Sequence, residues 1–265
     1  MKHARVAYEG AIHDAVAHPD GLRLTHGPHA GRCVSEDAVV WLPPLRPLAR
    51  PRTILALGLN YAERASTLEF KAPEEPLAFM KGESSLIGHR AHTVRPPAVK
   101  NMHYECELAV IIGQPARRVP RARALSVVDG YTVANDYAIR DDLENWYRPN
   151  LKVKNRPGAT PIGPWRVDAA DVPDPSALRL HTTVNGQRTQ SGSTADMIFD
   201  VPSLIEYFSH FMTLLPGDVI LTGTPDGVIN CVAGDVIVTT IEGIGALQNT
   251  LVAPPAPMPS TSPTP

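Results

Sequence analysis

Apolar residues along the chain fall mostly into short runs that stop at glycine, proline or charged residues, a spacing typical of β-strands. The clearest run is 103–113. Its first residues alternate between polar and apolar, and its tail is apolar and β-branched up to Gly113. We expect this stretch to form a central strand. Shorter strands are expected at 5–8, 10–16, 53–58, 77–81, 130–136, 178–184, 218–222 and 235–241.

Helical spacing is clear in the segment 202–212. Its apolar side chains recur every three or four positions and share one face, which we expect to lie in the core. Shorter helices are expected at 60–65, with Asn60 as the N-cap, and at 122–128. The apolar stripe of 202–212 consists of Leu204, Ile205, Phe208, Phe211 and Met212.

Turn residues and prolines divide the chain into units. Asn185-Gly186 predicts a type I′ hairpin turn, and the proline-rich stretch 155–175 predicts a loop. We expect residues 1–50 to form a small β unit ending in a proline-rich linker. Residues 51–252 are then the main domain, and the low-complexity stretch 253–265 is a disordered tail. The expected fold class is mixed β with a few helices.

Composition narrows the function classes. With 265 residues, 43% of them hydrophobic and 20% charged, the chain can bury a substantial core. A net charge of −2 gives no indication of binding to nucleic acid or to an anionic membrane. There are three widely spaced cysteines, no signal-peptide pattern and no membrane-spanning apolar run, so we expect a soluble cytoplasmic protein with reduced thiols.

Two carboxylates, Glu105 and Glu107, stand two residues apart on the expected central strand and therefore share one face. A cation or a shared proton would relieve their repulsion, and oxygen ligands suit a hard ion such as Mg²⁺. For this pair alone, a solvated strand face is the alternative. Asp136 ends the strand at 130–136, and Lys154 follows shortly after. Three carboxylates and one lysine are what a Mg²⁺ site acting on a 2-oxo acid needs.

Other polar residues were open to two interpretations. Lys81 ends the strand at 77–81 and is either a solvated strand end or a substrate contact. His89-x-x-His92 has no third ligand in view and is interpreted as a pair of surface histidines. The glycine-rich turns lack the spacing of a phosphate-binding loop, which argues against nucleotide binding.

Five separated motifs recur along residues 53–250: Tyr104-Glu105-x-Glu107-Leu108, Asn135-Asp136-Tyr137-x-x-Arg140-Asp141, Lys154-(x6)-Pro161-x-Gly163-Pro164, Val184-Asn185-Gly186 and Thr222-Gly223-Thr224-Pro225-x-Gly227-Val228. In order and spacing they resemble the fumarylacetoacetate hydrolase superfamily. The resemblance implies a β-roll or sandwich core, usually dimeric, with Mg²⁺ or Mn²⁺ in an open site.

Within the superfamily, segments 130–151, 194–199 and 206–213 are similar to the isomerase/decarboxylase branch of bacterial 4-hydroxyphenylacetate (homoprotocatechuate) degradation. Some members of that branch are fused duplicates, and the length of this chain resembles the C-terminal half as a separate subunit.

The resemblance implies roles for particular residues of this chain. The metal ligands would be Glu105, Glu107 and Asp136, and Lys154 would be the catalytic lysine. Thr224 and Tyr137 are candidates for substrate binding, although Thr224 could only cap a turn. Arg140, a charged neighbour of the site, would be the second catalytic residue, or it is only a partner of Asp141 or Asp142. The candidates to hold the far carboxylates of a substrate are Arg64, Lys81, Arg140 and Arg148.

One departure from the superfamily pattern concerns a histidine and a glutamate three positions apart, which activate water or move a proton in the hydrolytic and some decarboxylating branches. This chain has Arg64 and Thr67 at those positions. The loss argues against hydrolysis, and it leaves open a copy with weak or no activity.

The resulting hypothesis is a metal-dependent isomerase/decarboxylase of aromatic catabolism. It would act on 2-hydroxyhepta-2,4-diene-1,7-dioate and 5-oxopent-3-ene-1,2,5-tricarboxylate through a metal-stabilised dienolate. The alternatives are a C–C bond hydrolase of acylpyruvate or fumarylpyruvate type, or a non-catalytic subunit of a hetero-oligomer. A homodimer is expected, with a paralogous subunit as the other potential partner.

Overall fold

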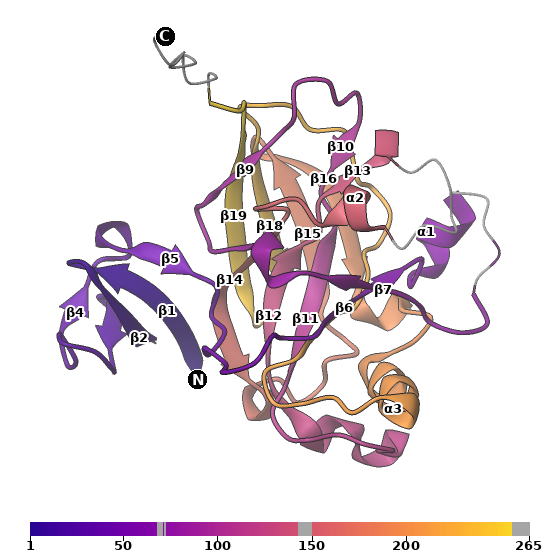
Figure 1. Ribbon diagram of the computed structural model, residues 1–265, viewed down its shortest axis with the longest axis horizontal. Coiled ribbons are helices and arrows are strands. Elements are labelled where there is room, and N and C mark those ends of the chain that lie inside the picture. Colours follow the sequence, from indigo (N-terminus) through magenta and orange to yellow (C-terminus); the bar gives the residue numbers. More distant parts are fainter. Residues whose placement is uncertain (68–70, 72, 143–149, 256–265) are drawn as a thin grey trace, which may run out of the picture.

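The computed structural model describes residues 1–67, 71, 73–142 and 150–255, and its core is built from two β-sheets packed face to face (Figure 1). The larger sheet contains, in spatial order, β4 (Cys33–Val34), β3 (Gly21–Leu24), β2 (Ala11–His18), β1 (Lys2–Tyr8), β14 (Thr160–Asp168), β12 (Val128–Asn135), β11 (Cys106–Ile112), β17 (Val219–Leu221), β6 (Ile54–Gly58) and β7 (Leu77–Lys81), with β5 (Val40–Leu42) paired to β1 and β8 (Leu86–Ile87) paired to β14.

The second sheet, together with the longest helix, covers one face of the first. This sheet contains, in spatial order, β16 (Gln187–Ser193), β15 (Arg179–Val184), β18 (Val236–Ile241), β19 (Gly245–Val252) and β9 (His92–Val94), and a separate pair is formed by β10 (Met102–His103) and β13 (Ala138–Ile139). The α-helices are α1 (Ala62–Thr67), α2 (Leu151–Lys154) and α3 (Val201–Phe211), and 3-10 helices lie at Glu36–Ala38, Glu83–Ser85, Arg121–Val127, Arg140–Asp142, Ala169–Asp171 and Thr194–Asp196.

The main core lies between the two sheets and under α3. Leu108 of β11, Leu180 of β15 and Leu247 of β19 meet there with Phe208 of α3. A second apolar cluster covers the opposite face of the large sheet. Strand β11 is therefore buried on both faces along its whole length, which explains its almost continuous apolar sequence.

The predicted central strand is present but begins later than expected. His103 belongs to β10, Glu105 lies between β10 and β11, and β11 starts at Cys106. The amide of Asp136 donates to the carbonyl of Glu105 at 2.8 Å, just beyond the last paired residues of β11 and β12. This pairing brings two predicted site residues together at one end of the strands.

Several helix and turn predictions need correction. Phe211 is 58% exposed, because α3 turns this end of its stripe towards solvent, whereas Phe208 is buried as predicted. Asn60 does not cap α1: its side chain bonds to Phe199 and to the Thr222 carbonyl instead. The helix expected at 122–128 is a 3-10 helix at Arg121–Val127. The type I′ turn is confirmed, since both Asn185 and Gly186 have positive φ, 51° and 80°.

The prediction of a loop at 155–175 is wrong, because β14 spans Thr160–Asp168. Pro164 is tolerated because the strand is irregular there. The pairing with β12 jumps from Val167 to Gly163, and Pro164 falls in that irregularity, where the ladder does not need its missing N–H.

The N-terminal strands extend the large sheet through β1, which pairs with β14, and they lie to one side of the molecule in Figure 1. They enclose their own apolar cluster. Trp41 adds a contact with the rest of the chain, with its ring centroid 5.2 Å from those of both His89 and Trp165. Gly88 approaches so closely that a Cβ there would lie 2.1 Å from the Trp41 carbonyl oxygen.

The boundaries 1–50, 51–252 and 253–265 stay predictions, and 256–265 lies outside the described residues.

Among the described residues, none of the helices has both the length and the apolar character needed to cross a membrane.

Phe208→Ala and Phe211→Ala provide a matched test of the α3 core. Phe208→Ala should lower the free energy of unfolding by about 3–5 kcal/mol, because it leaves a cavity between α3 and the sheets. Phe211→Ala should cost less than about 1 kcal/mol, since that ring is already largely in water. Urea unfolding followed by circular dichroism measures both values, and equal losses would contradict the packing described here.

His89 should give part of the pH dependence of stability. Burial, with the charge of Arg90, lowers the pKa of His89 to about 4, whereas the unfolded chain has the ordinary value of about 6.5. The unfolded chain therefore binds this proton first, and stability falls as pH decreases from about 6.5 to about 4. NMR titration of the ring protons should give a midpoint near 4, and His89→Gln should reduce the loss of melting temperature between pH 7 and 4.5. A midpoint near the ordinary value would contradict the burial.

Candidate active site

Glu105, Glu107 and Asp136 form a compact acidic cluster. One carboxylate oxygen from each lies within 4.8 Å of those of the other two. Glu107 and Asp136 are fully buried, and the Glu105 side chain is 16% exposed. Strand β11 carries Glu107, whereas Glu105 and Asp136 lie just outside the ends of β11 and β12. The two central strands of the sheet therefore position the cluster.

Glu107 has one carboxylate oxygen in use and one without a partner. Its Oε2 accepts the amide hydrogen of Gly223 at 2.6 Å, while Oε1 is buried with no hydrogen-bond partner among the described residues. Burial and the neighbouring Asp136 and Glu105 carboxylates raise the pKa of Glu107 well above its ordinary value. A buried acceptor in this state is costly unless a proton or a cation occupies it.

Two lysines enter the cluster. Lys154 Nζ lies 2.6 Å from Glu105 Oε2 and 2.9 Å from Asp136 Oδ2. Lys81 Nζ lies 2.5 Å from Asp136 Oδ1, and it also donates to the Lys154 carbonyl. Lys81 is only 3% exposed, so its interpretation as a solvated strand end is wrong. It is held there because β7 ends against α2, where Asn155 Oδ1 accepts the Gly82 amide hydrogen at 2.6 Å.

The two lysines differ in their electrostatic setting. Burial opposes the charge of Lys154, but the Asp136 and Glu105 carboxylates outweigh it and raise its pKa above the ordinary value. Burial dominates at Lys81, whose pKa is lowered although Asp136 partly restores it.

His103 contacts the outer side of the cluster, with Nε2 2.9 Å from Glu105 Oε1. Burial lowers the pKa of His103, which favours the neutral ring, although the bond to Glu105 opposes this shift. Burial alone would raise the pKa of Glu105, but Lys154 and His103 outweigh it and hold that carboxylate ionised. His103 thus orients Glu105 from the side away from Lys154.

The donor set fits a divalent cation. Three carboxylates against two ammonium groups leave one net negative charge in a buried site, and Glu107 Oε1 has no hydrogen-bond partner among the described residues. Oxygen-only ligands of this kind suit Mg²⁺ or Mn²⁺. A doubly charged ion would reverse the sign of the site and favour an anionic ligand.

The turn Thr222–Gly227 borders the cluster. Its Gly223 amide binds Glu107, and Thr224 Oγ1 accepts from Gln190 Nε2 at 2.9 Å. The Asn60 side chain donates to the Thr222 carbonyl at 2.8 Å. Asn60 also lies close to Gly223, since a Cβ added to Gly223 would be 2.9 Å from the Cβ of Asn60. The predicted residue Thr224 therefore lies beside the acidic cluster, with its hydroxyl held by a glutamine that the sequence did not single out.

Helix α1 is fastened to the same turn. Arg64 Nη1 donates to Asp226 Oδ1 at 3.0 Å, and the Thr67 hydroxyl donates to Asp226 Oδ2 at 3.0 Å. Arg64 and Thr67 are the two residues that depart from the superfamily pattern, and they share one carboxylate. Asp226 had no signal of its own in the sequence, since an aspartate after Thr-Pro in a turn is unremarkable by itself.

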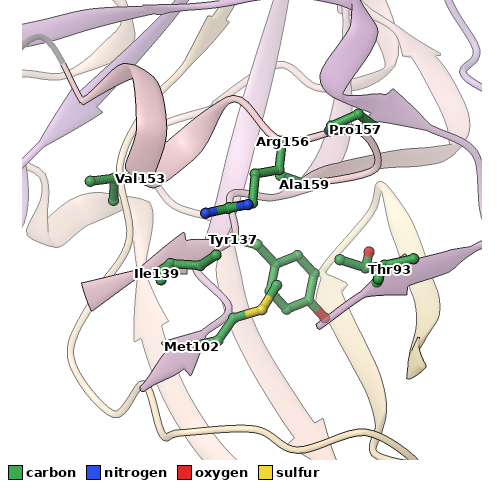
Figure 2. A pocket seen from close by; sticks show the side chains of 9 residues that line it. Thr93, Met102, Tyr137, Ile139, Val153, Arg156, Pro157 and Ala159 are labelled. Carbon is green, nitrogen blue, oxygen red and sulfur yellow. The ribbon is translucent and has the colours of Figure 1, made fainter. Parts of the chain in front are cut away.

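Other predicted residues lie farther from the carboxylates. The Tyr137 ring faces away into the core, where its hydroxyl donates to Asn249 at 3.2 Å. Figure 2 shows the ring lining a cavity of about 10 Å³, room for about one water molecule, together with Met102 and Ile139. The Arg140 side chain is exposed, and within the described part of the chain it forms no ion pair with Asp141 or Asp142. Arg148 lies outside the described residues. The site roles of these residues stay predictions.

The fold and the acidic cluster agree with the protein family that the chain matches in sequence. Residues 53–252 match the family described as fumarylacetoacetate (FAA) hydrolase C-terminal, and the chain belongs to this family. The predicted fold class and family are thereby confirmed.

Relatives with named activities make this family assignment more specific. The chain is 56% identical over 206 residues to the 4-hydroxyphenylacetate degradation bifunctional isomerase/decarboxylase of Salmonella dublin, covering 78% of this chain and 48% of that protein. It thus spans about half the length of this relative. It superposes on 5-carboxymethyl-2-hydroxymuconate delta-isomerase from Mycobacterium smegmatis with a TM-score of 0.84 and 36% identity, covering 97% of this chain and all of the other. It also superposes on 2-hydroxyhepta-2,4-diene-1,7-dioate isomerase from Mycobacterium marinum, with a TM-score of 0.83 and 33% identity. That superposition covers 97% of this chain and all of the other.

Lys81→Met tests how far folding depends on charge balance in the cluster. It should lower the free energy of unfolding by about 3 kcal/mol, the lower end for a broken buried pair, because Lys154 still contacts Asp136. Lys71→Met is the control, since Lys71 and Glu74 form an exposed pair whose loss should not be measurable. Both should be measured by urea unfolding in EDTA. Equal effects of the two substitutions would show that Lys81 is not buried against Asp136.

Proposed function

We propose that this chain is a metal-dependent isomerase/decarboxylase that acts on 2-hydroxyhepta-2,4-diene-1,7-dioate and 5-oxopent-3-ene-1,2,5-tricarboxylate. The observation that carries the proposal is the buried cluster of Glu105, Glu107 and Asp136, with Lys154 placed between two of its carboxylates. The relative from Mycobacterium marinum is named for isomerisation of the first of these compounds, and the relative from Salmonella dublin is an isomerase/decarboxylase, which supports the proposal. We further propose Mg²⁺ or Mn²⁺ as the cofactor and a homodimer as the working form.

In this proposal Glu105, Glu107 and Asp136 hold the ion. When bound, the ion supplies Lewis-acid stabilisation of negative charge on the keto oxygen of a 2-oxo acid. The protein keeps water away from two of the ligands, because Glu107 and Asp136 are fully buried. The Gly223 amide and His103 fix the orientation of Glu107 and Glu105.

Both reactions share one dienolate of the substrate. Loss of CO₂ from the carbon in vinylogous conjugation with the keto group leaves its electron pair in the dienolate, and the isomerisation enters the same species by loss of the enol proton. Protonation at the remote carbon then gives 2-oxohept-3-ene-1,7-dioate. Lys154 is the proposed donor, because its Nζ lies between the Glu105 and Asp136 carboxylates that would hold the ion.

The carboxylate at the other end of the substrate requires a cationic partner. Arg64 and Arg140 are the proposed candidates among the described residues, since a guanidinium binds a carboxylate through two parallel hydrogen bonds. Thr224 is proposed to contact the substrate between the two ends. A hydrolase of acylpyruvate type is disfavoured, because Arg64 and Thr67 both bind Asp226 and supply no base for a water molecule.

Glu107→Gln tests the proposal. Metal-stripped wild-type protein should convert both substrates only after Mg²⁺ or Mn²⁺ is added, as followed by the ultraviolet absorbance of the conjugated chromophore. Glu107→Gln should bind the ion at least about 100-fold more weakly by calorimetry, because one of three anionic ligands becomes neutral, and should lose metal-dependent turnover. Glu242→Gln is the control: this residue forms an exposed pair with Arg179 and should leave both properties unchanged.

The competing functions give other results. Cleavage of an acylpyruvate, with no change in the two proposed substrates, would replace the proposal with a hydrolase. A folded, metal-loaded protein with no turnover of any of these compounds would identify a non-catalytic subunit.

A further inference from the structure

The carboxylate of Asp226 binds two residues of α1 at once. Arg64 and Thr67 are three residues apart on the helix and so lie on the same side of it. Asp226 accepts from both at 3.0 Å, one on each oxygen. The direction that Arg64 takes from α1 is therefore determined by a residue of the turn Thr222–Gly227.

This ion pair is sheltered from solvent. The side chain of Arg64 is 10% exposed and that of Asp226 is 26% exposed. Because a sheltered pair is screened less than a surface pair, it holds a long side chain more firmly in one position. Arg64 uses only Nη1 in the bond to Asp226. A guanidinium has five N–H donors on three nitrogens, so this bond leaves capacity for a second anion.

The same turn connects Arg64 to the acidic cluster. Gly223 donates to Glu107 at 2.6 Å, and Asn60, just before α1, donates to the Thr222 carbonyl at 2.8 Å. Asp226 follows three residues after Gly223. The distance between Arg64 and the candidate metal ligands is thus set by one short turn that both contact.

We propose that Asp226 is a positioning residue that fixes Arg64 to bind the second carboxylate of a substrate whose other end is a 2-oxo acid held at the acidic cluster. The inference rests on the proposed function and deepens it. It gives α1 in this chain an anion-binding role at the two positions where the superfamily pattern has an acid–base pair. The substrate class follows: 2-oxo dicarboxylates should be preferred to 2-oxo monocarboxylates of the same chain length.

The test compares two unreactive ligands, 2-oxoheptanedioate and 2-oxoheptanoate, which differ only in the second carboxylate. Calorimetry with Mg²⁺-loaded full-length protein should show about 10- to 100-fold tighter binding of the diacid by the wild type, the range for a hydrogen-bonded charge pair. Arg64→Lys and Asp226→Ala should bring the two affinities within about threefold of each other, since lysine lacks the planar fork and alanine cannot hold Arg64. Affinity for the monoacid should not change.

Asp226→Asn is the conservative variant, because its amide oxygen can still accept from Arg64 Nη1. It should keep part of the preference that Asp226→Ala loses. Glu242→Gln, at the exposed pair with Arg179, should keep all of it. Thermal unfolding of each variant establishes that it is folded, and the ratio of the two affinities is a quantity that a purely structural role would leave unchanged.

The outcomes distinguish an error in the role of Asp226 from an error in the proposed 2-oxo acid site. If the wild type binds both acids equally, or if Asp226→Ala retains the preference or strengthens diacid binding, the positioning role of Asp226 is wrong. Tighter diacid binding in Asp226→Ala would mean that the aspartate only neutralises Arg64. If the wild type with Mg²⁺ fails to bind even the monoacid, the proposed 2-oxo acid site itself is wrong.

Discussion

The structure depends most on the electrostatic balance of one buried cluster, in which Glu105, Glu107 and Asp136 meet Lys81 and Lys154. Bringing three carboxylates within a few ångströms of one another is unfavourable, and burial increases the penalty. The two ammonium groups reduce it without removing it, since one net negative charge remains. The cluster therefore retains a reason to bind a cation.

The surrounding elements hold these five charged side chains in place. Strand β11 is buried on both faces, so it can place Glu107 deep in the sheet, and the pairing of Asp136 with the Glu105 carbonyl aligns the two strand ends. Lys81 comes from the edge strand β7 and Lys154 from α2, and Asn155 fastens these two elements together. Charges from four separate segments converge because each segment is held by backbone contacts of its own.

The sequence predicted those parts of the site that are carried by local patterns. Glu105 and Glu107 are two residues apart on a strand, and Asp136 and Lys154 stand in motifs that could be matched directly. The burial of Lys81 could not be predicted, because it arises from the packing of β7 against α2, and the pattern 77–81 shows only an apolar run ending in a charge. Asp226 was missed for a similar reason: its partners lie about 160 residues earlier in the chain, and hydrogen bonds of that kind leave no local signal. The sequence does not predict β14 because prolines usually interrupt strands, and here Pro164 falls where the ladder is irregular. It does not predict β19 because polar Asn249 points inwards to Asn135 and Tyr137.

The sharing of one carboxylate by Arg64 and Thr67 has an evolutionary consequence. Replacing Asp226 alone would leave a sheltered guanidinium without its counter-charge, and replacing Arg64 alone would leave a carboxylate held only by a hydroxyl. The effects of substitutions at these three positions should therefore be non-additive, as expected for residues in direct contact. Such epistasis restricts the order in which the positions can change. A change of ligand preference at this site is therefore expected to require coordinated changes at positions 64 and 226 rather than one replacement alone.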